Sequence, residues 1–195
     1  MMNITGRIGR LTTQGVIGAA AFAVVVCACF YTFLSADASG RRPLVILVRH
    51  GDAPGSGEPE GFTLGKCSTQ RNLSDKGRKQ AGEVGDRLRA AGIDVTKVMA
   101  SELCRTQQTA ALMRLGPVES SAAFDDLADF KQRADELLSS ERSIIAAWRG
   151  PGALLIVTHG SNIKALTGLH VQPGAVLMAK FSDEQLVAKL FSSNE

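Results

Sequence analysis

Continuous apolar runs alternate with helical patterns over most of the chain. Three short apolar runs predict buried strands at 44–48, 97–100 and 154–157, and the first is rich in β-branched residues, as in parallel sheets. Apolar positions with helical spacing predict helices over 75–91, 104–113, 129–148 and 161–169. Two further runs, 176–181 and 186–191, predict a hairpin. Strands that alternate with helices indicate an α/β fold, a three-layer sandwich with a mostly parallel central sheet and helices on both faces.

The longest apolar stretch, residues 15–34, lies outside this pattern. No charged residue occurs between Arg10 and Asp37, and 20 residues of helix are about 30 Å long, enough to span a bilayer. Arg7 and Arg10 precede the stretch, which favours a cytoplasmic N-terminus. The first interpretation is an uncleaved membrane anchor. The second is a signal peptide cleaved near Ala38, and the third is a helix buried in a core.

The first two interpretations divide the chain into an N-terminal anchor or signal segment with a linker, residues 1–42, and one globular domain, residues 43–195. They place this domain outside the cytoplasm, either anchored to the inner membrane or secreted to the periplasm. Residues 1–42 account for the whole formal charge of +3, so the domain is neutral and gives no support for nucleic-acid binding. An apolar content of 45% is enough for a buried core and argues against disorder.

Polar residues follow each of the three predicted strands. Arg49-His50-Gly51 ends the first, a cluster from Ser101 to Ala110 follows the second, and Thr158-His159-Gly160 ends the third. Ligands of parallel α/β sheets bind at the carboxyl ends of the strands. We therefore expect these three clusters to form one site.

The residue types in these clusters suit phosphoryl transfer. Arginine side chains match the equatorial oxygens of a phosphoryl group, and a neutral imidazole can attack phosphorus to form a phosphohistidine. Arg49, Arg105, His50 and His159 supply this set, with Arg71 as a possible third arginine. The histidines lack the close spacing of metal ligands, so we expect neither a metal site nor a cofactor.

The order and spacing of these motifs resemble the histidine phosphatase superfamily. The resemblance rests on the strand followed by RHG, on SELCRTQQTA and on LLIVTHG, and it covers about residues 44–181. The stretch GFTLGKCSTQRNLSDKGRKQA is also similar to a bacterial branch of small exported or membrane-anchored members. The resemblance implies the phosphoglycerate mutase-like fold, with His50 as nucleophile, Arg49 and Arg105 as phosphoryl ligands and His159 completing the pocket. We expect Arg71, Gly51 and Asn72 to contact the substrate.

The chain departs from this family where many members carry a glutamate that protonates the leaving group. Its segment 120–130 contains no glutamate, only Asp125, Asp126 and Asp129, and Asp126 is the best candidate. Some members of the family function without this acid, so the sequence leaves open whether a general acid exists.

Two cysteines, Cys67 and Cys104, flank the phosphate-binding stretches. In an exported domain they could form a disulfide, and the alternative is two reduced, buried thiols. The absence of a C-x5-R motif argues against Cys104 as a nucleophile.

The function predicted from these observations is a metal-independent phosphatase that hydrolyses a phosphomonoester or phosphoramidate of a small substrate. Two alternatives remain open. One is a catalytically weak protein that binds phosphate or a phosphoglycan, and the other is a transferase similar to phosphoglycerate mutase. The sequence does not identify the substrate, because one fold and one nucleophile serve many phosphorylated compounds.

Overall fold

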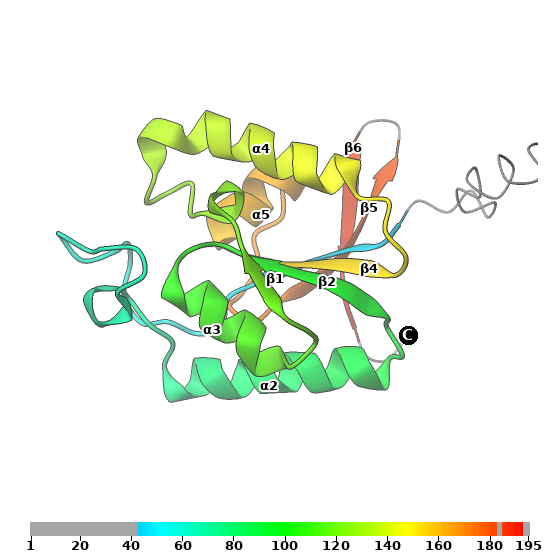
Figure 1. Cartoon of the computed structure of the whole chain (residues 1–195), viewed down its shortest axis with the longest axis horizontal. Coiled ribbons are helices and arrows are strands. Elements are labelled where there is room, and N and C mark those ends of the chain that lie inside the picture. The colour runs from blue at the N-terminus through cyan, green and yellow to red at the C-terminus, as the bar shows by residue number, and fades with distance from the viewer. Residues whose placement is uncertain (1–42, 183–184, 193–195) are drawn as a thin grey trace, which may run out of the picture. The chain divides into compact units, whose positions relative to one another are not determined.

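The computed structural model describes residues 43–182 and 185–192, which contain one six-stranded sheet with helices on its two faces (Figure 1). The strand order is β3-β2-β4-β1-β5-β6. The strands are β1 (Val45–Arg49), β2 (Val95–Ala100), β3 (Val118–Ser120), β4 (Ala153–Thr158), β5 (Val176–Ser182) and β6 (Gln185–Leu190). The α-helices are α2 (Asp75–Ala90), α3 (Cys104–Met113), α4 (Ala134–Ala147) and α5 (Gly160–Thr167). Three short 3-10 helices are η1 (Cys67–Thr69), η2 (Ala122–Phe124) and η3 (Lys131–Arg133).

The sheet is mixed. Strands β3, β2, β4 and β1 are parallel, whereas β5 pairs antiparallel with β1, and β6 pairs antiparallel with β5. The expected mostly parallel sheet is therefore correct for β1, β2 and β4, which carry the polar clusters, and the terminal hairpin adds the antiparallel pair.

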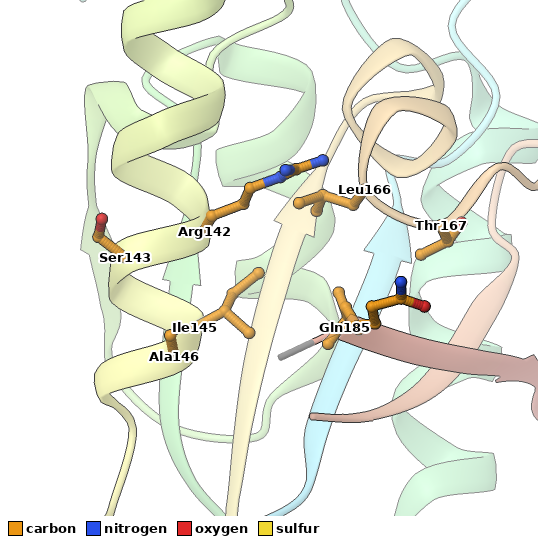
Figure 2. A pocket seen from close by; sticks show the side chains of 8 residues that line it. Arg142, Ser143, Ile145, Ala146, Leu166, Thr167 and Gln185 are labelled. Atoms are coloured by element: carbon orange, nitrogen blue, oxygen red, sulfur yellow. The ribbon is translucent and has the colours of Figure 1, made fainter. Parts of the chain in front are cut away.

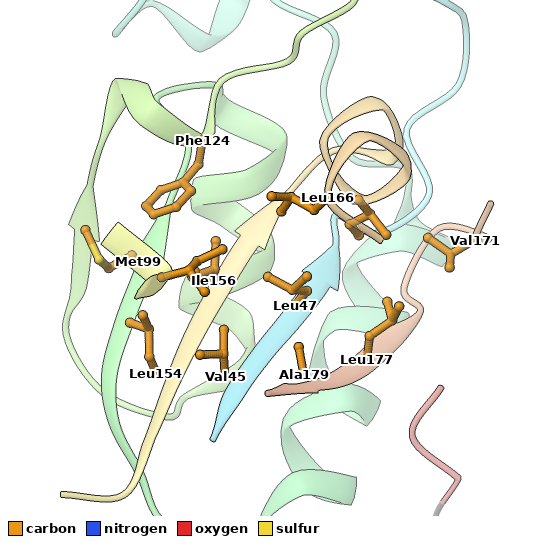
Figure 3. Close-up of a cluster of buried hydrophobic side chains, with 12 residues drawn as sticks. Val45, Leu47, Met99, Phe124, Leu154, Ile156, Leu166, Val171, Leu177 and Ala179 are labelled. Atoms are coloured by element: carbon orange, nitrogen blue, oxygen red, sulfur yellow. The ribbon is translucent and has the colours of Figure 1, made fainter. Parts of the chain in front are cut away.

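Alternating side chains of the central strands enter two separate cores. Val45 and Leu47 of β1 pack with residues of α4 and α5, as Figure 3 shows for this cluster. Ile46 and Val48 pack on the opposite face, with residues of α2 and α3. Each buried strand therefore has two apolar faces, which explains why the strands read as continuous apolar runs.

The predicted elements agree with the structure in the core and differ at its borders. Ser74 caps α2, because its Oγ accepts a hydrogen bond from the Gly77 N–H at 3.1 Å. The predicted helix over 129–148 is too long, since α4 begins at Ala134 after a 3-10 turn. The short edge strand β3 was not predicted, because three residues carry too little periodicity.

The predicted membrane-spanning stretch, residues 15–34, lies outside the described residues. Across residues 43–182 and 185–192, no helix is both long and apolar enough to cross a membrane.

Candidate active site

The pairing of β1 with β4 brings the two motif histidines together. Arg49 is opposite Thr158 in the parallel register, so the residues that follow, His50 and His159, are neighbours at the carboxyl ends of the strands. Their ring centroids are 5.3 Å apart. Arg105, in the first turn of α3, contacts both rings: Nε donates to His50 Nε2 at 3.3 Å and Nη2 donates to His159 Nδ1 at 3.2 Å. The sequence prediction that the three clusters meet is confirmed.

The imidazole of His50 has its proton fixed on one nitrogen. Nδ1 lies 2.8 Å from the carbonyl oxygen of Gly51, which can only accept, so we assign the proton to Nδ1 and a lone pair to Nε2. Burial, followed by the nearby charge of Arg105, lowers the pKa of His50 to about 3, although the bond to Gly51 opposes this shift. The ring is therefore neutral at physiological pH, with Nε2 free to act as a nucleophile.

The proton of His159 lies on the other nitrogen. The Thr106 hydroxyl donates to the Leu103 carbonyl at 2.6 Å, so the Ser101 hydroxyl donates to Thr106 and its oxygen accepts from His159 Nε2 at 2.8 Å. Nδ1 of His159 then carries the lone pair that faces Arg105. Burial, and next the charge of Arg105, hold the pKa of His159 well below its usual value.

Arg105 is the centre of the site and is fully buried. Its Nη1 contacts Glu58, and its Nη2 donates to Asp126 at 3.0 Å and to Asp129 at 3.2 Å. A buried guanidinium needs such partners, because its charge is costly to remove from water. These three carboxylates hold it in a fixed orientation against the two histidines.

Arg49 lies at the border of the same site. Its Nη1 donates to the Val171 carbonyl at 2.6 Å, while its Nε is buried with no partner in the described part of the chain. Gly160 provides the space for this guanidinium, since a Cβ there would lie 3.2 Å from its Cζ. The unpartnered Nε–H is a donor that a phosphoryl oxygen could use.

Asp126 lies next to both His159 and Arg105. Its Oδ2 lies 3.4 Å from His159 Nδ1, in addition to the contact with Arg105, and its Oδ1 accepts from Ser161 Oγ at 2.5 Å and from the Ala128 N–H at 3.0 Å. The neighbouring Asp125 instead accepts from the Glu102 N–H at 2.8 Å, and burial raises the pKa of Asp125 to about 6.

The three residues expected to bind substrate mainly shape the loop between β1 and α2. Arg71 donates to the carbonyls of Gly57 and Ala53, at 3.0 and 2.7 Å. Asn72 donates to the carbonyls of Cys67 and Gln70, at 2.6 and 2.7 Å. Gly51 allows close packing on α2, because a Cβ there would lie 2.5 Å from the Gly77 carbonyl oxygen. Within the described residues, the side chains of Arg71 and Asn72 donate to backbone carbonyls of the protein, and the contact of these three residues with substrate stays a prediction.

The cysteines Cys67 and Cys104 form a disulfide, with their Cα atoms 5.6 Å apart. The bond ties the start of η1 to the start of α3, one residue before Arg105. Gln70 reinforces the same connection, since its Oε1 accepts from the Cys104 N–H at 2.8 Å. Of the two alternatives that the sequence left open, the structure has the disulfide.

Sequence reasoning missed Glu58 and Ser101. Ser101 was inside the quoted motif and could have been identified as the residue that closes β2. Glu58 lies in the loop 52–66 with Glu60, and nothing in the local pattern distinguishes the two. Only the folded loop places the Glu58 side chain, 2% exposed, on Arg105.

An open groove of about 570 Å³ lies between α4, α5 and β6, and no predicted site residue lines it (Figure 2).

Within residues 43–182 and 185–192, no group of three or more His, Cys, Asp or Glu side chains is arranged to hold a metal ion.

Comparison with known proteins connects this site to a family. Residues 45–127 match the model of the histidine phosphatase superfamily (branch 1). The mitochondrial serine/threonine-protein phosphatase Pgam5 of Drosophila ananassae is 39% identical over 69 residues, which are 35% of this chain and 21% of that protein. The chain thus aligns with about a fifth of the length of such relatives.

Solved structures share the fold at low sequence identity. The α-ribazole phosphatase from Shigella flexneri superimposes with a TM-score of 0.57 and 18% identity, covering 77% of this chain and 96% of that one. The protein histidine phosphatase SixA, complexed with tungstate, gives a TM-score of 0.55 and 15% identity, with 77% and 97% covered. These likenesses show a common fold with a mixed central sheet.

Proposed function

We propose that this chain, whose residues 45–127 match the model of the histidine phosphatase superfamily (branch 1), is a phosphatase whose phosphoryl acceptor is His50. The observation that carries the proposal is the tautomer of His50. Its Nδ1 proton is held by the Gly51 carbonyl, and its Nε2 lone pair faces Arg105 in a buried site. A neutral imidazole held in this way is a nucleophile for phosphorus.

The reaction has two displacements at phosphorus. In the first, the His50 Nε2–P bond forms while the P–O bond to the leaving alcohol breaks, and that oxygen takes a proton from solvent. In the second, water attacks phosphorus and releases a proton to solvent, the N–P bond breaks, and inorganic phosphate leaves. Arg105 and the free Nε–H of Arg49 donate to the equatorial oxygens, whose charge must be stabilised in both steps.

We infer that His159 and Asp126 assist by different means. His159 Nδ1 lies 3.2 Å from Arg105 Nη2 and can donate to a bound phosphoryl oxygen once it gains a proton, because Ser101 holds the proton of the neutral ring on Nε2. Asp126 accepts hydrogen bonds from Arg105, Ser161 and the Ala128 N–H, as ionised carboxylates do. These contacts favour Asp126 as a residue that orients Arg105 rather than as the acid for the leaving group.

The substitution His50→Ala tests the proposal. It should abolish hydrolysis of p-nitrophenyl phosphate by the full chain, because the proposed covalent intermediate forms on His50 Nε2. Far-UV circular dichroism should stay unchanged. Residual turnover above about 1% of wild type would refute the assignment, given that removal of a covalent nucleophile typically costs far more.

We also propose that turnover needs no metal ion, since arginines supply the positive charge that a metal would otherwise provide. EDTA should then leave the rate unchanged. Loss of activity that a divalent ion restores would contradict this part of the proposal.

For the whole chain, we propose that residues 15–34 direct the domain out of the cytoplasm, as a membrane anchor or a signal segment of the bacterial branch described above. The disulfide between Cys67 and Cys104 supports this location, because disulfides persist in oxidising compartments and are rare in the cytoplasm.

A further inference from the structure

Every nitrogen of the Arg105 guanidinium already has an acceptor inside the protein. Nε donates to His50, and Nη2 donates to Asp126, Asp129 and His159. Nη1 contacts Glu58. Nη1 has a second N–H, but the guanidinium is fully buried, so a phosphoryl oxygen can reach Arg105 only if a group packed against it moves.

Glu58 and Asp129 are the carboxylate acceptors of Arg105 with the fewest other hydrogen bonds, and Glu58 is the one whose neighbours on both sides are exposed. Asp126 is held by Ser161 and by the Ala128 N–H as well as by Arg105. Glu58 has one other hydrogen bond, from the Arg71 N–H to its Oε2 at 2.9 Å, and its neighbours 54–57 and 59–61 are exposed. Moving Glu58 thus leaves the buried framework of the site unchanged.

The loop that carries Glu58, residues 53–62, packs against the segment that carries Asp129. A Cβ on its Gly57, which has φ +67°, would lie 3.5 Å from Asp129 Oδ1. The rings of Phe62 and Phe130 meet edge to face at 6.0 Å. His50 and Arg105 are only 2% and 0% exposed, and Glu58 of this loop contacts Arg105, so a substrate that binds this guanidinium must displace a part of the protein packed against it.

The charges around Arg105 also favour the displacement of Glu58. Three arginines in and around the site (Arg49, Arg71 and Arg105) face three carboxylates (Glu58, Asp126 and Asp129). A phosphoryl dianion adds two negative charges to this balanced set. Displacement of the Glu58 carboxylate relieves the repulsion that results.

We propose that Glu58 is an internal anion that occupies the phosphoryl subsite on Arg105 and competes with the substrate for it. The inference rests on the proposed function, because it takes Arg105 as the phosphoryl ligand. Glu58 then sets the affinity of the enzyme, since substrate binds only to the fraction of molecules in which this carboxylate has left Arg105. The loop acts as a cover that an incoming phosphoryl group opens by exchange of one anion for another.

The direct test is the affinity for inorganic phosphate, measured by isothermal titration calorimetry on the full chain. Glu58→Gln removes the competing charge and keeps the side-chain size, so the Kd should fall by about tenfold or more. Glu60→Gln is the matched control, because Glu60 is exposed in the same loop and makes the same charge change away from Arg105. Its Kd should stay within about twofold of wild type. A Glu58→Gln variant with unchanged or weaker phosphate binding would overturn the proposal.

A second measurement uses the wild-type chain and does not depend on a variant that folds. Phosphate should speed hydrogen exchange at the Arg71 amide, which loses its acceptor when Glu58 leaves. Slower or unchanged exchange at this amide would contradict the proposal.

Turnover of p-nitrophenyl phosphate separates the two levels of inference. If wild type hydrolyses this ester but Glu58→Gln does not tighten phosphate binding, the competitor role fails and the proposed function stands. If no variant hydrolyses the ester but the affinities follow the expected order, the proposed function fails and the competitor role stands.

Discussion

His50 and His159 are the same residue type at equivalent places on neighbouring strands, and their environments make them different reagents. The carbonyl of Gly51 keeps the proton of His50 on Nδ1, while Ser101 keeps that of His159 on Nε2. Burial lowers the pKa of both rings, so neither needs to lose a proton before it acts. The Gly51 hydrogen bond therefore supports the proposed role of His50 as nucleophile, whereas His159 would have to gain a proton on Nδ1 before it could donate to a phosphoryl oxygen.

Asp126 gives a prediction at the residue scale. Asp126→Asn weakens the hold on Arg105, so hydrolysis of an aryl phosphate and of an alkyl phosphate should fall by similar factors of about tenfold or more. Steady-state kcat/KM for p-nitrophenyl phosphate and for glycerol phosphate gives the comparison. A loss confined to the alkyl phosphate would instead identify Asp126 as the general acid, because only the alkoxide needs a proton to leave.

The residues of the site could be predicted where a strand or a helix fixes them. His50, His159 and Arg105 are placed by β1, β4 and α3, whose apolar patterns are strong. Glu58 could not be predicted, since its position depends on a loop path set by turns and by a disulfide. Sequence spacing carries no information on which of two nearby glutamates turns inward.

At the scale of elements, the long loop between β1 and α2 depends on its connection to α3. The disulfide closes a segment with a sequence separation of 37 and joins it to the residue before Arg105. Gln70 spans the same gap, donating to the Thr63 carbonyl at 2.9 Å and accepting from the Cys104 N–H. Helix α3 and the loop thus form one unit around the guanidinium.

Removal of the disulfide should weaken this unit. The double variant Cys67→Ser/Cys104→Ser is expected to lose about 3–4 kcal/mol of unfolding free energy, the value that a loop of this length implies. Urea denaturation of the oxidised wild type and of the variant measures the difference. A variant as stable as wild type would show that the bond adds nothing to the fold.

Helices α4 and α5 are joined by a buried acid. Glu141 is fully buried, and its Oε2 accepts from Asn162 Nδ2 at 3.0 Å, while the same amide donates to the Asp125 carbonyl at 3.0 Å. Burial raises the pKa of Glu141 to about 8, against the effect of the Asn162 hydrogen bond. The folded protein therefore holds this proton at neutral pH, whereas the unfolded chain, with an ordinary carboxyl pKa near 4.5, does not.

The higher pKa of Glu141 in the folded state predicts the direction in which stability changes with pH. Between about pH 5 and 8 the folded state binds more protons than the unfolded state, so stability should fall as pH rises, by up to about 1.4 kcal/mol per pH unit. Glu141→Gln should remove this part of the slope, because the amide does not titrate. Urea denaturation of both proteins across this range gives the two slopes, and equal slopes would show that Glu141 is ionised in the folded state.

At the scale of the whole molecule, the sequence predicted the layers better than the strand directions. A continuous apolar run implies a strand that is buried on both faces, and hence helices on both faces of the sheet, and both cores are present. The apolar pattern did not predict that β5 pairs antiparallel with the parallel part of the sheet. A side-chain pattern indicates which faces of a strand are buried, and not which strands pair.

The disulfide, the apolar stretch and the charge distribution all bear on where the domain is located, and this location can be tested on the full chain. If residues 15–34 cross the membrane once with Arg7 and Arg10 inside, the other end of the chain is outside the cytoplasm. An alkaline phosphatase reporter fused after residue 195 should then be active in a bacterial host, and a green fluorescent protein fused at the same point should be dark.

Arg7→Glu with Arg10→Glu should reduce the alkaline phosphatase signal, because these cations hold the N-terminus inside. Lys76→Glu with Lys79→Glu is the matched control, since it makes the same charge change on exposed positions of α2. A reporter that is active only in the cytoplasm would refute the topology, and with it the oxidising compartment that would maintain the disulfide.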